Sequence, residues 1–339
     1  METSVMSDQQ TVAGELIVVD WGTTNFRAFL LDKNAQIIKQ VSAASGVLAV
    51  SEGQFEAALN NYISDWCSDK HIPVIMAGMV GSKVGWQDTG YLHCPVSLSK
   101  SAQHLVHLDV ASPQQKFIVP GFKYQPQRGA SDVMRGEEVQ VFGALSIIEQ
   151  EQGVISEAEL ARSIFCLPGT HSKWACVSKD CNGESVITRF STHMTGEVFD
   201  LVTKHSILSA GLTQQHKEAD TDLSQFLQGV ACSQLQGGLL HHLFSARTLQ
   251  LENKLPAAAV YSYISGLIIG AELHSVIANE PVLEHIYLIG NNRLNNLYSA
   301  ALLSLGYSST ILNSSQASIN GMFAIAKHAG LILSTEVTL

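Results

Sequence analysis

A pattern of strand, glycine turn and second strand occurs twice in the chain and limits the folds that it can adopt. Apolar residues 16–19 precede Asp20 and the first turn, and apolar residues 164–167 precede the second turn. The turn residues are Gly22, Thr23 and Thr24 in the first copy and Gly169, Thr170 and His171 in the second. The repetition of this unit predicts a fold with two similar halves rather than one domain with a single core.

The elements that follow each hairpin also correspond. A third strand is predicted at residues 36–41 in the first half and at residues 184–190 in the second. Each half later contains an apolar strand that ends in glycine, at 74–78 and at 286–290. Two halves with the same order of elements predict two α/β domains with a ligand cleft between them.

The chemistry of the two turns favours an anionic ligand. Glycine lets the backbone approach a ligand closely, and successive turn N–H groups form a concave site for anions. Asp20 ends the first strand beside such a turn, where a carboxylate can hold a hydrated Mg²⁺ that bridges to phosphates. We therefore predict that one hairpin from each domain binds the phosphates of a nucleotide, from opposite sides of the cleft.

Composition excludes several other classes of function. The 339 residues carry a net charge of −10 and no basic stripe, which argues against a nucleic-acid partner. The apolar run at 257–271 is shorter than a membrane span and predicts a buried helix, so no membrane partner is expected. The six cysteines form no C-x-x-C pair, which favours reduced thiols in a cytoplasmic protein.

The division of the chain follows from its strand and helix signals. Residues 1–14 read as a loose polar tail, 15–121 as the N-terminal domain and 122–339 as the C-terminal domain. Within the latter, about 222–279 contains helical patterns without a strand signal and predicts a helical insertion. The apolar helices after Asp222 are compatible with a homodimer.

The motifs that are missing narrow the choice of nucleotide fold. The sequence has neither a P-loop nor a glycine-rich dinucleotide fingerprint, and it lacks the metalloprotease and serine-hydrolase motifs. The two Gly-Thr hairpins instead resemble the phosphate hairpins of the actin-like ATPase and sugar-kinase superfamily. Gly290 and Asn291 stand where that superfamily places its adenosine-binding turn.

Further strings narrow the resemblance to one family. The segments 76–86, 134–140, 168–174, 193–197 and 265–272 are similar to those of 2-dehydro-3-deoxygalactonokinases. The resemblance implies two ribonuclease-H-like domains around a cleft. It also implies ATP- and Mg²⁺-dependent phosphorylation of 2-dehydro-3-deoxy-D-galactonate on its terminal 6-hydroxyl, with Asp20 orienting the metal.

Phosphoryl transfer also needs a base that takes the proton of the acceptor hydroxyl. Glu137 is the first candidate, because it begins a helix in the manner of the catalytic aspartate of related sugar kinases. Asp132, in the loop before that helix, is its rival. Acidic residues in a first helical turn also stabilise the helix dipole without any catalytic role, so this alternative stays open.

A carboxylate-bearing substrate calls for a cation. Arg135 is the first choice, because a guanidinium forms two parallel hydrogen bonds with a carboxylate. The other predicted substrate-binding residues lie on glycine-rich turns: Ser82, Lys83, Trp86 and Gly46. Two other functions stay open, a kinase for another sugar or sugar acid and a non-catalytic nucleotide or sugar sensor.

Overall fold

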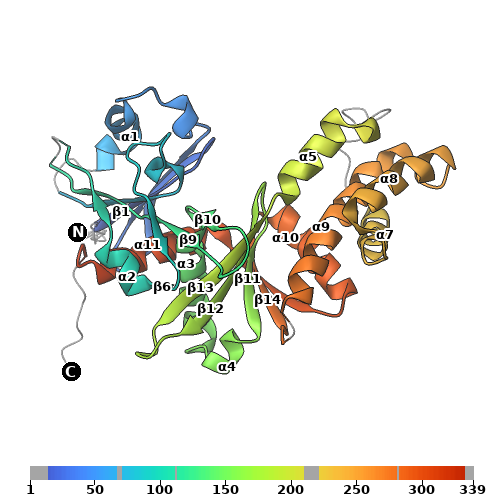
Figure 1. Cartoon of the computed structure of the whole chain (residues 1–339). Coiled ribbons are helices and arrows are strands. Elements are labelled where there is room, and N and C mark those ends of the chain that lie inside the picture. The colour runs from blue at the N-terminus through green and yellow to red at the C-terminus, as the bar shows by residue number, and fades with distance from the viewer. Residues whose placement is uncertain (1–13, 67–70, 111–112, 210–220, 281, 333–339) are drawn as a thin grey trace, which may run out of the picture.

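The computed structural model describes residues 14–66, 71–110, 113–209, 221–280 and 282–332. Two six-stranded sheets form the body of the molecule, and a third, three-stranded sheet lies beside them (Figure 1). Helices α5, α7 and α8 lie at the opposite end of the molecule from α1. The mixed α/β class predicted from the sequence is confirmed.

The elements follow one another in two similar series. The strands of the first half are β1 (Leu16–Trp21), β2 (Phe26–Leu31), β3 (Ile37–Ala43), β4 (Val74–Ala77), β5 (Tyr91–His93), β6 (Val96–Ser97), β7 (Val106–His107), β8 (Lys116–Ile118) and β9 (Gly121–Tyr124). Those of the second half are β10 (Asp132–Met134), β11 (Ser163–Leu167), β12 (Ser172–Lys179), β13 (Ser185–His193), β14 (His285–Gly290) and β15 (Ser308–Asn313). The α-helices are α1 (Phe55–Ile63), α2 (Leu98–Gln103), α3 (Glu137–Gln152), α4 (Glu157–Leu160), α5 (Thr195–His205), α7 (Leu223–Ser233), α8 (Gly238–Leu251), α9 (Val260–Ala278), α10 (Asn292–Ser304) and α11 (Ser314–His328). Short 3₁₀ helices occur at Val47–Ala49, Ser64–Trp66, Met79–Gly81, Ile207–Ser209 and Ala257–Ala259.

The two large sheets share one strand order. In the first, β3, β2 and β1 are antiparallel neighbours, and β4 and β8 continue in parallel beside β1. In the second, β13, β12 and β11 repeat the antiparallel part, and β14 and β15 repeat the parallel part. The predicted duplication is thus confirmed, and each sheet has the strand order of a ribonuclease-H-like domain.

The two halves are tied together by elements that cross between them. Strand β6 of the first half adds to the edge of the second sheet by pairing with β13. Helix α11, from the end of the chain, packs on α3 and contacts β1 and β4 of the first sheet. One apolar cluster includes Val18, Ile75, Phe165 and Tyr287, so both sheets share a core through these helices. The division at residue 121 stays a prediction.

The contact between α3 and α11 is a backbone contact. A Cβ atom on Gly143 would overlap the carbonyl of Ala317, and one on Gly321 would overlap the carbonyl of Val139. Glycine is needed at both positions because the helix axes approach too closely for any side chain. This close crossing holds the N-terminal end of α3 at a fixed place between the two sheets.

Helices α7, α8 and α9 occupy the region predicted as a helical insertion. The stretch Ala257–Ala278 is long and apolar enough to cross a membrane, with a mean hydropathy of 1.3. However, 67% of its apolar window is buried against neighbouring parts of the protein. The stretch is therefore long enough to span a membrane, which corrects the length expected from the sequence, and it is mostly buried, as the sequence predicted.

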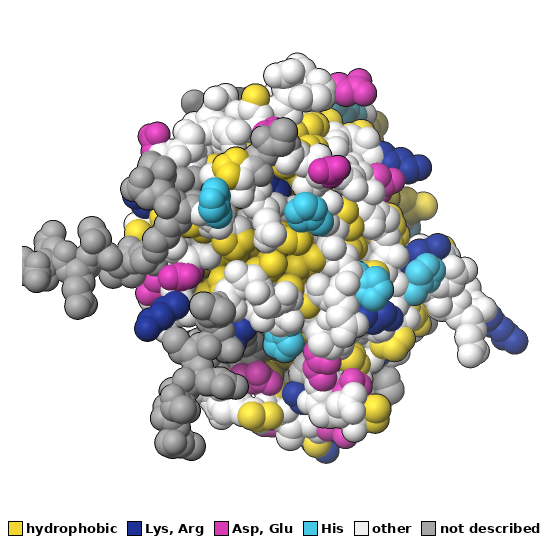
Figure 2. All heavy atoms as spheres, turned by 90° about the vertical axis from the view of Figure 1, so that its left-hand side faces the viewer, with side chains coloured by type: hydrophobic (Ala, Val, Ile, Leu, Met, Phe, Trp, Pro, Cys, Tyr) yellow, Lys and Arg dark blue, Asp and Glu magenta, His cyan; other side chains and the backbone are white. Residues whose placement is uncertain are grey.

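One face of the molecule, turned by 90° from the first view, is shown in Figure 2. Lys, Arg, Asp and Glu side chains are scattered over this face, and apolar side chains gather near its middle. Among the residues drawn in colour there, the basic side chains form no continuous stripe of the kind that binds nucleic acid.

Candidate active site

The first glycine hairpin is a rigid turn braced from behind. The N–H of Gly22 donates to the carbonyl of Asn25 over 2.9 Å and closes the turn. The segment after β3 supports it, since the N–H of Gly46 donates to the carbonyl of Thr24 over 3.0 Å. A Cβ atom on Gly46 would overlap the backbone of Thr23. Gly46, predicted to line the substrate pocket, therefore makes its described contacts with the hairpin, and a contact with substrate stays a prediction.

The second glycine hairpin is braced by the N-terminus of α5. A Cβ atom on Gly196 would lie 2.7 Å from the carbonyl oxygen of Gly169, so the helix touches the turn directly. The N–H of Glu197 donates to the carbonyl of Thr170 over 3.1 Å, and its carboxylate lies 2.5 Å from Nε2 of His171. The hairpin and the helix thus form one unit.

A buried carboxylate ties this unit to the helices behind it. Glu272 of α9 is 5% exposed and accepts hydrogen bonds from Trp174 Nε1 over 2.6 Å, from Tyr298 Oη over 2.7 Å and from Thr195 Oγ1. Burial raises the pKa of Glu272, and these three donors oppose that shift. The Tyr298 hydroxyl also lies 3.0 Å from the Ser172 hydroxyl, which follows the hairpin. Glu272 therefore connects β12, α5, α9 and α10 below the second turn.

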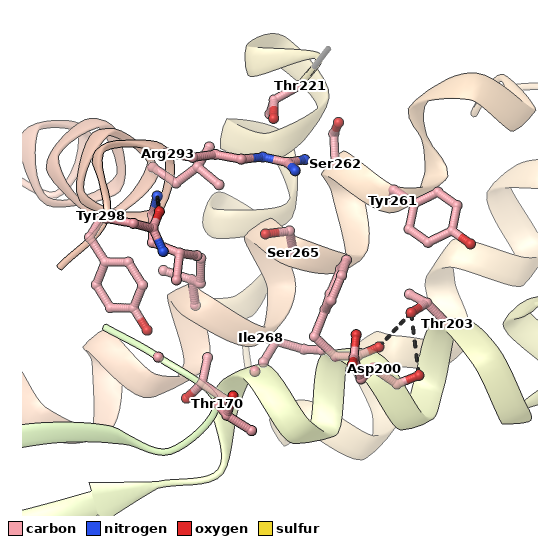
Figure 3. A pocket seen from close by; sticks show the side chains of 18 of the residues that line it. Thr170, Asp200, Thr203, Thr221, Tyr261, Ser262, Ser265, Ile268, Arg293 and Tyr298 are labelled. Carbon is pink, nitrogen blue, oxygen red and sulfur yellow. Dashed lines mark hydrogen bonds between the residues drawn. The ribbon is translucent and has the colours of Figure 1, made fainter. Parts of the chain in front are cut away.

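A cavity of about 470 Å³ opens above this network, between α5, α9 and α10. Its lining includes Gly169 and Thr170 of the hairpin and Asn291 at the start of α10. In Figure 3, Arg293 extends toward Ser262 across the cavity. The structure therefore brings the second predicted phosphate-binding turn and Asn291 of the predicted adenosine-binding turn to the same cavity.

The adenosine-binding turn is shaped by close packing. Asn291 caps α10, because its side chain accepts a hydrogen bond from the N–H of Leu294 over 2.9 Å. A Cβ atom on the preceding Gly290 would lie 2.8 Å from Oδ1 of Asn295. Gly290 itself is not among the residues that line the cavity. No role was predicted from sequence for the lining residues Thr195, Ser265 and Arg293, although the first two lie in strings that carried the family resemblance.

The acidic residues gather where the first hairpin meets the start of α3. Gly78 contacts the end of β1, since a Cβ atom there would lie 2.9 Å from the carbonyl oxygen of Trp21 and 3.6 Å from Oδ1 of Asp20. A Cβ atom on Gly136 would in turn lie 3.2 Å from Cα of Gly78. These two glycines have φ values of 96° and 106°, which an L side chain adopts only with strain. Glu137 is thereby brought near Asp20.

The carboxyl groups of this cluster hold their protons more tightly than in water. Burial raises the pKa of Asp20, and the Arg27 guanidinium, 3.8 Å away, opposes this shift. Burial also raises the pKa of Glu137, with the charge of Asp20 adding to the effect and Lys173 opposing it. Glu138, fully buried behind them, has its pKa raised to about 8 by burial and by the charge of Glu137. Burial and neighbouring like charges produce such shifts, and they are typical of functional sites.

The two rival base candidates differ in their hydrogen bonds. The Asp132 carboxylate accepts from the Thr192 N–H over 2.8 Å, from the Thr192 hydroxyl and from the Val133 N–H over 3.0 Å. Its oxygens are thus engaged in holding β10 against β13. The Glu137 carboxylate accepts one hydrogen bond from another residue, from the Arg135 N–H to Oε2 over 2.9 Å. Glu137 keeps acceptor capacity for a proton.

Arg135 is buried against the loop that follows the 3₁₀ helix Met79–Gly81. Its Nη1 donates to the Thr89 hydroxyl over 2.6 Å, and its Nη2 donates to the Gly90 carbonyl over 2.9 Å. The guanidinium carbon also lies 4.5 Å from the centre of the Tyr91 ring. Its Nε–H is buried without a partner. Arg135 therefore shapes this loop and retains one unused donor.

The remaining predicted substrate residues share that loop. The Ser82 hydroxyl donates to the Met79 carbonyl over 2.7 Å, and Lys83 is exposed. Trp86 is partly buried and stacks on Phe55 with ring centres 6.2 Å apart. Ser82 and Trp86 thus have structural contacts of their own, while the Lys83 side chain faces solvent.

Comparisons with known proteins identify one family over almost the whole chain. The family profile described as 2-keto-3-deoxy-galactonokinase matches residues 20–325. The chain is 32% identical to a 2-dehydro-3-deoxygalactonokinase of Escherichia coli (strain K12), over 91% of this chain and 97% of the relative. It is 30% identical to a probable 2-dehydro-3-deoxygalactonokinase of Rhizobium meliloti (strain 1021), over 94% and 98%. The crystal structure of a putative 2-dehydro-3-deoxygalactonokinase protein from Sinorhizobium meliloti superposes with a TM-score of 0.81 at 29% identity, covering 92% of this chain and 98% of that chain.

Proposed function

Since the chain belongs to the 2-keto-3-deoxy-galactonokinase family, we propose that it transfers the γ-phosphoryl group of ATP to the 6-hydroxyl of 2-dehydro-3-deoxy-D-galactonate. The observation that carries this proposal is the family match over almost the whole chain. The cavity beside the second glycine hairpin supports it, because a kinase that uses ATP needs a site for the nucleotide. The galacto epimer rests on the family, since no residue chemistry described above selects it.

ATP is the phosphoryl donor of a kinase with this fold. In our proposal the adenosine occupies the cavity between α5, α9 and α10, next to Asn291. The backbone N–H groups of Gly169 to His171 and of Thr23 and Thr24 then face the phosphates, where oriented N–H groups stabilise negative charge. Gly22 contributes by letting the turn approach closely, since its own N–H is bonded to the Asn25 carbonyl. Of the two hairpins, the second lies closer to the proposed adenosine, because Gly169 and Thr170 line its cavity.

Asp20 is our candidate for orienting Mg²⁺. Mg²⁺ is usually held by one or two carboxylates together with water and phosphate oxygens. The site suits this mode, because Asp20 lies near a second carboxylate, Glu137. When bound, Mg²⁺ neutralises charge on the phosphates.

Glu137 is our candidate for the base, with Asp132 as a structural clamp. The acceptor hydroxyl donates its proton to the Glu137 carboxylate as the new O–P bond forms. Asp132 already accepts three hydrogen bonds, which fix the segment that leads to Glu137.

Arg135→Ala is expected to raise the KM for the sugar acid about 10- to 100-fold and to leave the KM for ATP nearly unchanged. A hydrogen bond to a charged group contributes about 1.5–3 kcal/mol, which corresponds to this range. Arg135 also shapes the loop that carries Lys83. Initial-rate measurements against each substrate would test this, with Lys83→Ala as the comparison. Equal effects on both KM values would argue against a role toward the sugar acid.

A coupled assay for ADP release tests the function itself. With ATP and Mg²⁺, we expect turnover on 2-dehydro-3-deoxy-D-galactonate and much slower turnover on the gluco epimer and on a neutral hexose. Turnover on another acceptor alone would keep the kinase and replace its substrate. ATP binding without turnover on any acceptor would instead favour the nucleotide or sugar sensor.

We further propose that the protein is cytoplasmic and forms a homodimer. We also propose that its two domains, at 15–121 and 122–339, close on their ligands. The free cysteines among the described residues support a reducing compartment. Exposed apolar side chains on α7 and α8, including Leu223, Leu240 and Phe244, support self-association.

A further inference from the structure

Lys173 is a buried lysine for which no role was predicted. It follows the second glycine hairpin by two residues, and only 6% of it is exposed. Side chains alternate along β12, so Lys173 shares a face with Ala175 and Val177, which belong to the core around α3. Its neighbour Trp174 points to the other face, where it donates to Glu272. Lys173 therefore points toward α3 and away from the helical insertion.

The Asp132 clamp brings the start of α3 to the position of Lys173. Thr192 of β13 is the cross-strand partner of Lys173, and Thr192 donates two hydrogen bonds to Asp132. The chain then runs from Asp132 through β10 to Glu137. The charge of Lys173 opposes the upward shift of the Glu137 pKa, which places the two groups in each other's field. Lys173 thus lies on the catalytic side of the sheet.

The ammonium group lacks a bonded partner of its own. In the part of the chain that the structure describes, the Lys173 side chain takes part in no hydrogen bond and no ion pair, although it lies in the field of Glu137. Its Nζ is not among the fully buried atoms without a partner, so the ammonium group keeps contact with solvent and is free to bind an anionic ligand. The anion expected at this place is the terminal phosphate of a nucleotide whose adenosine lies in the cavity beyond Gly169 and Thr170.

We propose that Lys173 is a catalytic residue, whose ammonium group binds the γ-phosphoryl oxygens between the second hairpin and Glu137. This inference rests on the proposed function. During transfer, the acceptor hydroxyl gives its proton to Glu137, the new O–P bond forms, the bond from the γ-phosphorus to the β–γ bridging oxygen breaks, and ADP leaves. Lys173 neutralises charge on the transferred group.

Another lysine of the same strand provides a matched control. Lys179 lies on the same face of β12, six residues further along, which is about 20 Å in an extended strand. Its Nζ donates to the Ser185 hydroxyl over 2.9 Å and lies 3.6 Å from the Glu149 carboxylate. Lys179 is thus already paired and distant from the hairpin.

The experiment compares Lys173→Met, Lys173→Arg and Lys179→Met. Lys173→Met is expected to lower kcat about 10²–10³-fold, as the loss of one donor to a developing charge does. It should also remove the tighter binding of a non-hydrolysable ATP analogue relative to ADP, measured by calorimetry. Lys173→Arg should recover part of both effects, and Lys179→Met should change neither.

Three outcomes would overturn the proposal. The first is a kcat of Lys173→Met within about threefold of the unaltered protein. The second is that Lys173→Met still binds the ATP analogue more tightly than ADP, by the same ratio as the unaltered protein. The third is that Lys173→Met loses activity only because its melting temperature is lowered, while that affinity ratio is kept. If the unaltered protein shows no kinase activity with any acceptor, the proposed function fails. The affinity ratio then still decides whether Lys173 binds the γ-phosphate.

Discussion

Glu137→Gln is expected to lower kcat about 10²–10⁴-fold, the usual contribution of a general base. The amide keeps the size of the side chain and its acceptor for the Arg135 N–H, so the fold and ATP binding should persist. The raised pKa of Glu137 adds a second expectation. Because the ionised carboxylate is the active form, activity should fall as the pH drops through a value above 4.5. Initial rates across pH, with ATP affinity measured separately, test both points.

Glu138→Gln is the matched control, since Glu138 is the next residue in the same helical turn. Its pKa of about 8 means that its carboxyl group is largely protonated at neutral pH, which the amide imitates. Glu138→Gln should therefore keep most of the activity. An equal loss in both variants would point to damage at the start of α3. Near-normal rates for Glu137→Gln together with an inactive Asp132→Asn would transfer the role of base to Asp132.

Glu272→Ala is expected to lower the free energy of unfolding by about 3–5 kcal/mol, the range for breaking a buried charged network. The substitution leaves the Trp174 indole N–H and the hydroxyls of Thr195 and Tyr298 without their acceptor in a dry interior. Denaturant unfolding measures this loss. Because Thr195 stands next to the Gly169 turn, ATP affinity should fall as well.

Glu280→Ala provides the comparison for that result. Glu280 also accepts two hydrogen bonds from a residue of the second sheet, at 2.6 and 2.7 Å from Arg189. This pair is more exposed than the Glu272 network, and exposed ion pairs contribute about 0–1 kcal/mol. A loss for Glu272→Ala no larger than for Glu280→Ala would contradict the structural role that we assign to Glu272.

The pH dependence of stability gives Glu272 a further signature. Its folded-state pKa is raised above the ordinary value of 4.5, so the folded protein binds its proton more tightly than the unfolded chain. The stabilisation from this group is fully present below pH 4.5 and is lost as the pH rises through the folded pKa. Glu272→Gln should remove that part of the pH dependence.

The sequence alone determined the parts of this protein that depend on local pattern. Apolar runs, glycine turns and their repetition predicted two hairpins, the strands that follow them and a duplicated unit. The ribonuclease-H-like fold was implied by the resemblance to the kinase family. The long apolar stretch was correctly predicted as a core helix. These features need only neighbouring residues, because strand alternation and turn geometry are set within a few positions.

Only the tertiary structure decided which side chains meet. Glu137 was the first candidate for the base and Asp132 its rival, and only the structure showed that Asp132 is engaged by Thr192, sixty positions away. The Glu272 network joins residues 26 to 98 positions apart, and the Lys173 side chain faces α3 only because β12 lies in this sheet in this register. Such long-range contacts depend on how complete elements pack, and no short pattern of residues encodes them.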